Sequence, residues 1–115
     1  MFTIMFIFLI HFIADFYLQT EWMALGKSKN WTPLLAHIAV YTVACLVLSP
    51  FVLPIWTAIC WSLINGLCHL VVDYFSSRAM RRAREAGNNS RFFLLLGFDQ
   101  LCHAWCLLGT FGLLI

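Results

Sequence analysis

The stretch NGLCHLVVD (residues 65–73) places a histidine and an aspartate four positions apart inside an apolar segment. Residues four apart lie one above the other on the same face of a helix. The same spacing occurs in each of the three other apolar segments, as HFIAD (11–15), HIAVY (37–41) and DQLCH (99–103). Ionisable groups are costly inside a membrane and normally face the interior of a helix bundle. The pattern therefore predicts four helices whose polar stripes converge on one site.

The composition favours a membrane protein. Of the 115 residues, 63% are hydrophobic and only 10% are charged, which lies far outside the range of soluble domains. The first apolar segment has no basic start and contains His11 and Asp15, so we expect a retained helix rather than a cleaved leader. We predict an all-α, integral membrane four-helix bundle that forms one domain over residues 1–115. Its helices are expected at about residues 1–25, 33–48, 55–86 and 91–115.

The basic residues predict the orientation of the bundle. All of them lie in or beside the first and third loops: Lys27, Lys29, Arg78, Arg81, Arg82, Arg84 and Arg91. The positive-inside rule makes both of these loops cytoplasmic and puts both termini on the other side of the membrane. Counted from the cytoplasmic helix ends at about 1.5 Å per residue, the polar pairs overlap in one layer of the cytoplasmic half. This shared depth indicates a single site.

The paired residues suit a metal centre. Imidazole and carboxylate groups together are ligands for zinc, manganese or iron, and we expect a divalent ion, with zinc favoured. The candidate ligands are His11, Asp15, His37, His69, Asp73, Asp99 and His103. They suffice for two ions, or for one ion with a general base and a proton relay. Asp15 and Asp99 are the candidate catalytic carboxylates, and Tyr41 is a candidate acid or hydrogen-bond donor.

Amides and arginines extend the polar stripes. Gln19 and Asn65 continue two of them at the same spacing, either as hydrogen-bond partners that orient metal ligands or as contacts between helices. Three arginines follow Asp73: Arg78, Arg81 and Arg82. They either determine the membrane orientation and attract anionic lipid, or they bind a phosphate headgroup. We expect no nucleic-acid partner, because the basic patch is short and no binding module is present.

The motifs, in this order, resemble a family of small bacterial and bacteriophage membrane proteins called domain of unknown function 3307. The resemblance rests on HFIADFYLQ (11–19), LLAHIAVY (34–41), NGLCHLVVD (65–73) and FDQLCH (98–103) and covers nearly the whole chain. More distantly, the chain resembles LexA-regulated inner-membrane proteins described as metal-dependent hydrolases.

The resemblance implies a place in the bacterial inner membrane but no substrate. It also implies a set of signature positions, in which Gln100 is a further hydrogen-bond partner of the site: His11, Asp15, Gln19, His37, Tyr41, His69, Asp73, Asp99, Gln100 and His103.

Two classes of function fit these residues. The favoured one is metal-dependent hydrolysis of an amphiphilic substrate, a lipid ester or a lipid phosphate, that reaches the site from the membrane. The alternative is a protein without enzymatic activity: an ion or proton conduit, or a small membrane effector that binds a larger protein. A conduit of four helices would need a homo-oligomer to form a pore. Since the half of the chain near the termini has almost no ionisable residue, we expect a site closed on that side.

Overall fold

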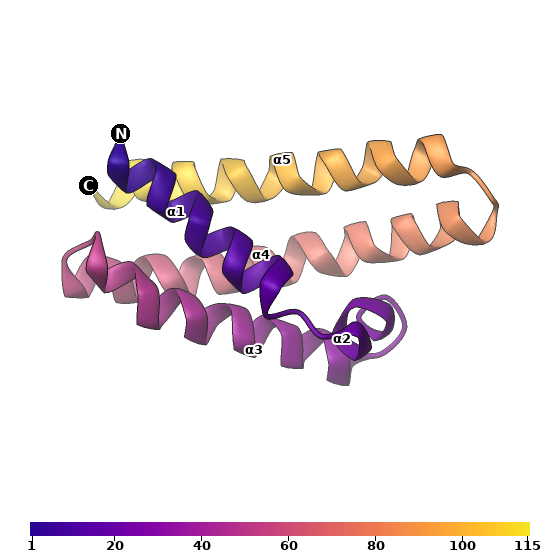
Figure 1. Cartoon of the computed structure of the whole chain (residues 1–115), viewed down its shortest axis with the longest axis horizontal. Helices are drawn as coiled ribbons and strands as arrows, with labels where there is room; N and C mark the ends of the chain where they lie inside the picture. Colours follow the sequence, from indigo (N-terminus) through magenta and orange to yellow (C-terminus); the bar gives the residue numbers. More distant parts are fainter.

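The computed structural model describes residues 1–115, which are helical almost throughout and contain no strand. The two longest helices, α4 (Ile55–Glu85) and α5 (Asn89–Leu114), form an antiparallel hairpin, and α3 (Trp31–Leu48) packs along α4 (Figure 1). The other elements are α1 (Phe2–Phe12), the π-helical turn η1 (Ile13–Tyr17), α2 (Glu21–Gly26) and the 3-10 turn η2 (Ser49–Phe51). The predicted all-α fold class is confirmed.

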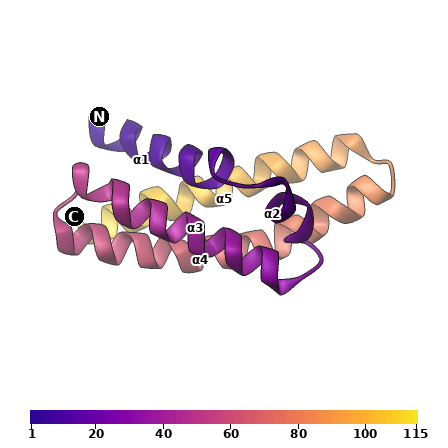
Figure 2. The ribbon, with the colours of Figure 1, turned by 60° about the horizontal axis from the view of Figure 1, so that its bottom comes forward.

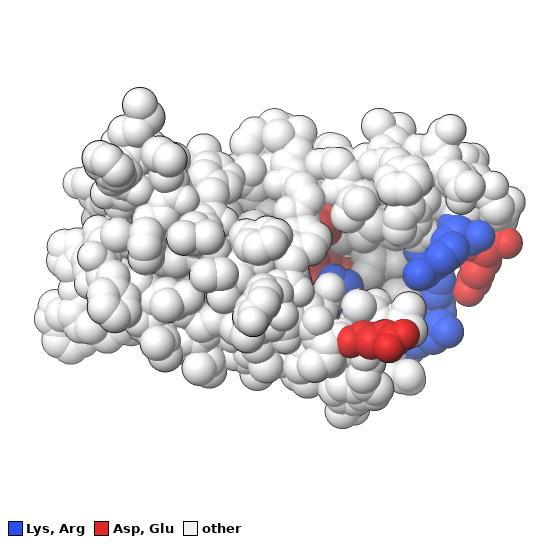
Figure 3. Space-filling view, viewed as in Figure 1, with Lys and Arg blue, Asp and Glu red and all other residues white.

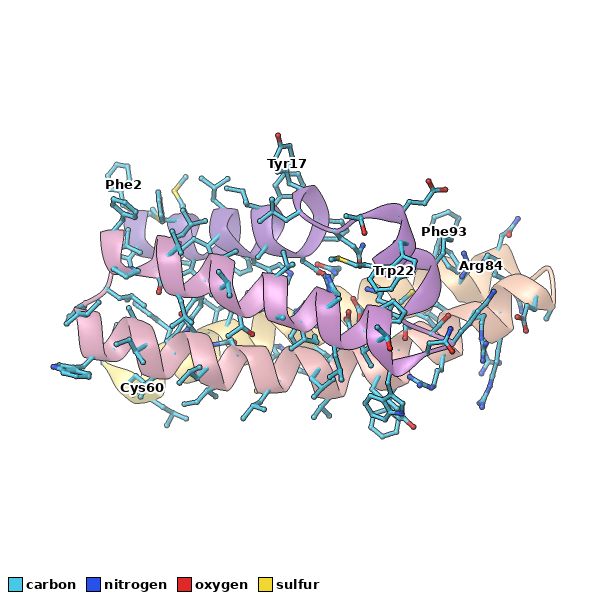
Figure 4. All side chains as sticks on the ribbon, turned by 90° about the horizontal axis from the view of Figure 1, so that it is seen from below. Phe2, Tyr17, Trp22, Cys60, Arg84 and Phe93 are labelled. Atoms are coloured by element: carbon cyan, nitrogen blue, oxygen red, sulfur yellow. The ribbon has the colours of Figure 1, made fainter.

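The bundle buries polar as well as apolar side chains and exposes many large apolar ones. Three helical stretches are long and apolar enough to cross a membrane: Trp31–Phe51, Ile55–Glu85 and Asn89–Leu114. A fourth apolar stretch, Phe2–Tyr17, is shorter. Side chains such as Phe2, Tyr17 and Cys60 project away from the bundle (Figure 4). Figure 3 shows that the charged side chains on one face gather toward one end. This distribution is compatible with a membrane protein.

The first segment is not one helix over residues 1–25, as its apolar pattern predicted. After α1 the backbone widens into the π-helical turn η1, and the chain then becomes extended at Thr20, with φ −76° and ψ 161°. The Thr20 hydroxyl accepts a hydrogen bond from the backbone N–H of Met23 at 3.3 Å and so caps a new short helix, α2. Figure 2 shows the extended link between η1 and α2. The three other helices agree with the predicted bounds to within about two residues.

Two glycines permit the helix pairing. Gly87 has φ 69°, a left-handed conformation that favours glycine, in the turn between α4 and α5. Gly66 faces Thr42, and a Cβ at Gly66 would overlap the Thr42 hydroxyl. The absence of a side chain at Gly66 therefore lets α3 and α4 approach closely. Their approach brings the polar stripes of the two helices together.

Candidate metal centre

The four predicted pairs meet inside the bundle. Their side chains come from η1 and from α1, α3, α4 and α5, and all eight residues are buried, with at most 6% of their surface exposed: His11, Asp15, His37, Tyr41, His69, Asp73, Asp99 and His103. The convergence follows from the i, i+4 spacing, which keeps each pair on one helix face. In lipid, that face has to turn inward.

Four ligand atoms form a compact group, which we call the four-atom group: His37 Nε2, His69 Nε2, Asp15 Oδ1 and Asp73 Oδ2. His37 Nε2 lies 3.1 Å from His69 Nε2, 3.1 Å from Asp15 Oδ1 and 3.3 Å from Asp73 Oδ2. His69 Nε2 lies 3.2 Å from Asp15 Oδ1 and 3.4 Å from Asp73 Oδ2. Ligands at about 2.0–2.1 Å from a tetrahedral ion lie about 3.3 Å apart. These spacings therefore fit one metal ion.

A second group of possible ligands adjoins the first. It contains Asp73, Asp99 and His103, whose ligand atoms lie within 4.8 Å of one another. His103 Nε2 is 3.1 Å from Asp73 Oδ1 and 3.5 Å from Asp99 Oδ2. Asp73 therefore belongs to both groups, with one carboxylate oxygen facing each. The second group has three protein ligands, so a fourth position would stay open in a tetrahedral ion.

The carboxylates of the centre outnumber the lysine and arginine side chains paired with them. Asp15, Asp73 and Asp99 are buried carboxylates, and Lys27 is the one Lys or Arg side chain paired with them, through an Nζ–Oδ2 distance of 2.8 Å to Asp73. With neutral imidazoles, two negative charges remain. Buried charge without a counterion is costly. One divalent cation would neutralise the cluster, and so would two protonated histidines.

Aromatic packing and hydrogen bonds fix the histidine rings. The His69 ring is stacked between Tyr41 and His103, with centroid distances of 3.9 and 4.1 Å. The Nδ1 atoms of His37 and His69 have no hydrogen-bond partner, so both rings make their polar contacts through Nε2, the atom in the four-atom group. A fixed ring orientation is what a metal ligand requires.

A family model described as Protein of unknown function (DUF3307) matches residues 3–113. The chain belongs to this family. The match spans all four motifs and confirms the family that they predicted. No curated protein and no solved structure gives a significant match.

In this DUF3307 protein, His11 and Tyr41 border the ligand groups without belonging to either. The Tyr41 hydroxyl is hydrogen bonded to His11 Nδ1 at 3.1 Å, and His11 Nε2 lies 3.3 Å from Gln100 Oε1. The Gln100 amide also donates to Asp99 Oδ2 at 3.0 Å and to Asp15 Oδ2 at 3.4 Å. His11, Tyr41 and Gln100 thus form a hydrogen-bonded chain that reaches two of the carboxylates.

The two amides singled out from the sequence lie in different places. Gln19 lines a cavity beside the centre, and its Oε1 is buried without a partner. Asn65 points away from the ligands: its Nδ2 donates to Trp61 O at 2.9 Å and to Thr110 Oγ1 at 2.8 Å. Asn65 therefore links α4 to α5 one turn away from the centre.

The three arginines expected at a headgroup do not line that cavity. Arg78 lies over the Tyr74 ring at 3.7 Å, and Arg81 is 4.0 Å from the exposed Glu85. Arg82 lines a separate hollow near the α4–α5 turn. The cations that line the cavity beside the centre are instead Lys27 and Arg84.

Sequence reasoning missed several residues at the centre. Ser76 donates a short hydrogen bond to Asp99, and Lys27 pairs with Asp73. Ser77 lines the cavity and continues the α4 stripe at the next i+4 position after Asp73, a signal that was available. Lys27 gave no such signal, because its position depends on the break between η1 and α2.

Proposed function

We propose that this DUF3307 protein is a membrane-embedded, metal-dependent hydrolase that acts on an amphiphilic substrate. The observation that carries the proposal is the four-atom group, whose spacing fits a metal ion, beside the three-residue group with its open position. We take zinc as the metal, since nitrogen and oxygen ligands at tetrahedral spacing suit it; manganese and iron accept the same ligand types.

The residues of the chain then divide into roles. His37, His69, Asp15 and Asp73 would hold one ion, and a bound ion that also took an ester or phosphoryl oxygen as a ligand would supply Lewis-acid polarisation of that oxygen. Asp15 and Asp99 line the cavity, so each carboxylate is placed to take a proton from water or substrate there. In the proposal Tyr41 acts as a hydrogen-bond donor to His11.

The proposed orientation puts the centre in the cytoplasmic half of the bacterial inner membrane. Both termini lie at the end of the bundle opposite the α4–α5 turn, and the lysines and arginines lie toward that turn (Figures 1 and 3). Under the positive-inside rule this turn is cytoplasmic. A lipid of the inner leaflet is then the amphiphile nearest to the cavity.

Buried apolar side chains in the half of the bundle nearer the termini favour a site closed on that side. They count against the conduit alternative. The half of the bundle nearer the termini is filled by fully buried side chains that include Ile7, Ile10, Trp61 and Leu107. Apolar constrictions of this kind tend to exclude water. We therefore favour an enzyme over an ion or proton conduit.

A vesicle assay tests the proposed function. Zinc-loaded protein in sealed liposomes should release product from phosphatidate or from an ester lipid, because the centre adjoins a cavity that those headgroups can enter. A chelator should stop the reaction, and added zinc should restore it. The same liposomes should leak protons and cations no faster than liposomes without protein. A leak without product, abolished in Asp99→Asn, would replace the hydrolase by the conduit.

A further inference from the structure

A cavity of about 220 Å³ lies directly beside the metal centre, on the side of α2 and the α4–α5 turn. Its polar floor contains Asp15, Asp99 and Gln100, and its polar walls include Lys27 and Arg84. Figure 3 shows a hollow near the charged end of the molecule in which acidic and basic side chains are visible. A volume of this size holds about seven water molecules, enough for a small headgroup but not for a whole lipid.

Two buried hydroxyls line the cavity without a partner. Ser28 is 4% exposed and Ser77 is 5% exposed, and neither Oγ makes a hydrogen bond within the protein. Buried hydroxyls are normally hydrogen bonded, and one without a partner is destabilising. Ser28 follows Lys27 in the chain, Ser77 lies one helical turn after Asp73, and both residues line the same cavity. They are placed to donate to a bound group.

The unused hydrogen-bonding groups of the cavity are mainly donors, with Gln19 Oε1 the one unpartnered acceptor. The carboxylates on its floor already accept bonds: Asp15 from His37 and Gln100, and Asp99 from Ser76 and Gln100. The Arg84 side chain makes no hydrogen bond; its guanidinium lies 5.8 Å from the Phe92 ring, and the residue is exposed. Free hydroxyl and guanidinium donors beside an ammonium select an anion with several acceptor oxygens.

We propose that this cavity binds the phosphate group of a phosphomonoester, held by Lys27, Ser28, Ser77 and Arg84. The claim that the cavity binds the substrate rests on the proposed function. The claim that it binds an anion rests only on the unpaired donors that line it. Gln19 Oε1, also buried and unpartnered, can accept from a protonated phosphate oxygen or a neighbouring hydroxyl. The apolar remainder of the lining includes Phe16, Leu25 and Phe92, which suits the first carbons of a lipid chain. Asp15 and Asp99 repel the anion until a divalent ion is bound, so phosphate and metal bind with positive coupling.

The test is calorimetric titration of the zinc-loaded and the chelator-treated full chain in detergent. The two probes are inorganic phosphate and a short-chain phosphatidate, which separate a free phosphate from a lipid headgroup. Both should bind the zinc-loaded protein, the phosphatidate more tightly, and zinc should strengthen binding. Ser77→Ala and Arg84→Gln should each weaken binding about tenfold, as expected for a hydrogen bond to a charged group.

Two matched variants serve as controls. Ser62→Ala removes another buried hydroxyl of α4, which is bonded to Ser49 far from the cavity, and Arg82→Gln removes a cation that does not line it. Neither should change phosphate affinity. If inorganic phosphate binds and the phosphatidate does not, the ligand is not a lipid headgroup. If Ser77→Ala, Arg84→Gln and the wild type bind phosphate with equal affinity, the cavity is not the phosphate site.

The outcomes also separate this inference from the proposed function. Protein that retains zinc and hydrolyses an ester lipid but binds no phosphate contradicts the phosphate site alone. Protein that holds no zinc but binds phosphate in a Ser77-dependent manner supports the site and contradicts the hydrolase.

Discussion

The Asp73→Ala variant is expected to purify without stoichiometric divalent metal. Asp73 is the residue shared by both ligand groups, with Oδ2 facing His37 and His69 and Oδ1 facing His103. Loss of even a hydrogen-bond partner of a ligand lowers metal affinity about 10–100-fold, and loss of a ligand from both groups should exceed that. Elemental analysis of protein from zinc-replete cells measures the effect.

Two further variants keep this result interpretable. Removal of the Asp73 carboxylate leaves the partly buried Lys27 ammonium without its partner, which is destabilising and could unfold the chain. Asp73→Asn keeps the side-chain volume and should still lose most of the metal, because an amide is a weaker ligand. Glu85→Gln removes an exposed carboxylate of the same helix and should retain the wild-type metal content. Stoichiometric zinc in both Asp73 variants would show that the ligands are assigned wrongly.

Under the proposed function, hydrolysis should fall by about 10²–10⁴-fold in the Asp99→Asn variant, the range typical for loss of a general acid or base. Asp99 lies at the boundary between the centre and the cavity and is not part of the four-atom group. An ion bound at the four-atom group should therefore remain, and the loss should appear in kcat. The measurement is the initial rate on the lipid that the wild type hydrolyses, together with metal content.

The control for Asp99 is Glu21→Gln, which neutralises an exposed carboxylate of α2 and should leave the rate unchanged. Full activity in Asp99→Asn would remove Asp99 from the reaction and leave Asp15 as the carboxylate that lines the cavity. An equal loss of zinc and activity would assign Asp99 to metal binding alone.

The sequence predicted the inward-facing polar layer because that layer follows from helix periodicity and the cost of charge in lipid. His69 and Asp73, four residues apart in an apolar helix, had to face inward together. The same reasoning placed the partners on the other helices, including His37 and His103. Whether their ligand atoms lie at metal-binding distance depends on side-chain packing, such as the Tyr41 ring against His69, and no spacing rule gives that distance.

The break in the first segment could not be predicted in the same way. Residues 13–19 contain no proline or glycine that would mark a break, and the π-helical turn packs against α3, which is distant in the sequence. After this break α2 packs against α3, and Lys27 pairs with Asp73. Sequence reasoning therefore selected the arginines nearest to Asp73 in the chain as headgroup residues, whereas the cavity beside the centre is lined by Lys27 and Arg84.

The most direct test of the metal centre is X-ray absorption spectroscopy at the zinc edge of the purified, zinc-loaded protein. The four-atom group predicts two imidazole nitrogens and two carboxylate oxygens at about 2.0–2.1 Å and no sulfur ligand. The five cysteines are free, so sulfur at about 2.3 Å would place the metal elsewhere. That result, or the absence of bound zinc under metal-replete conditions, would contradict a His/Asp metal centre.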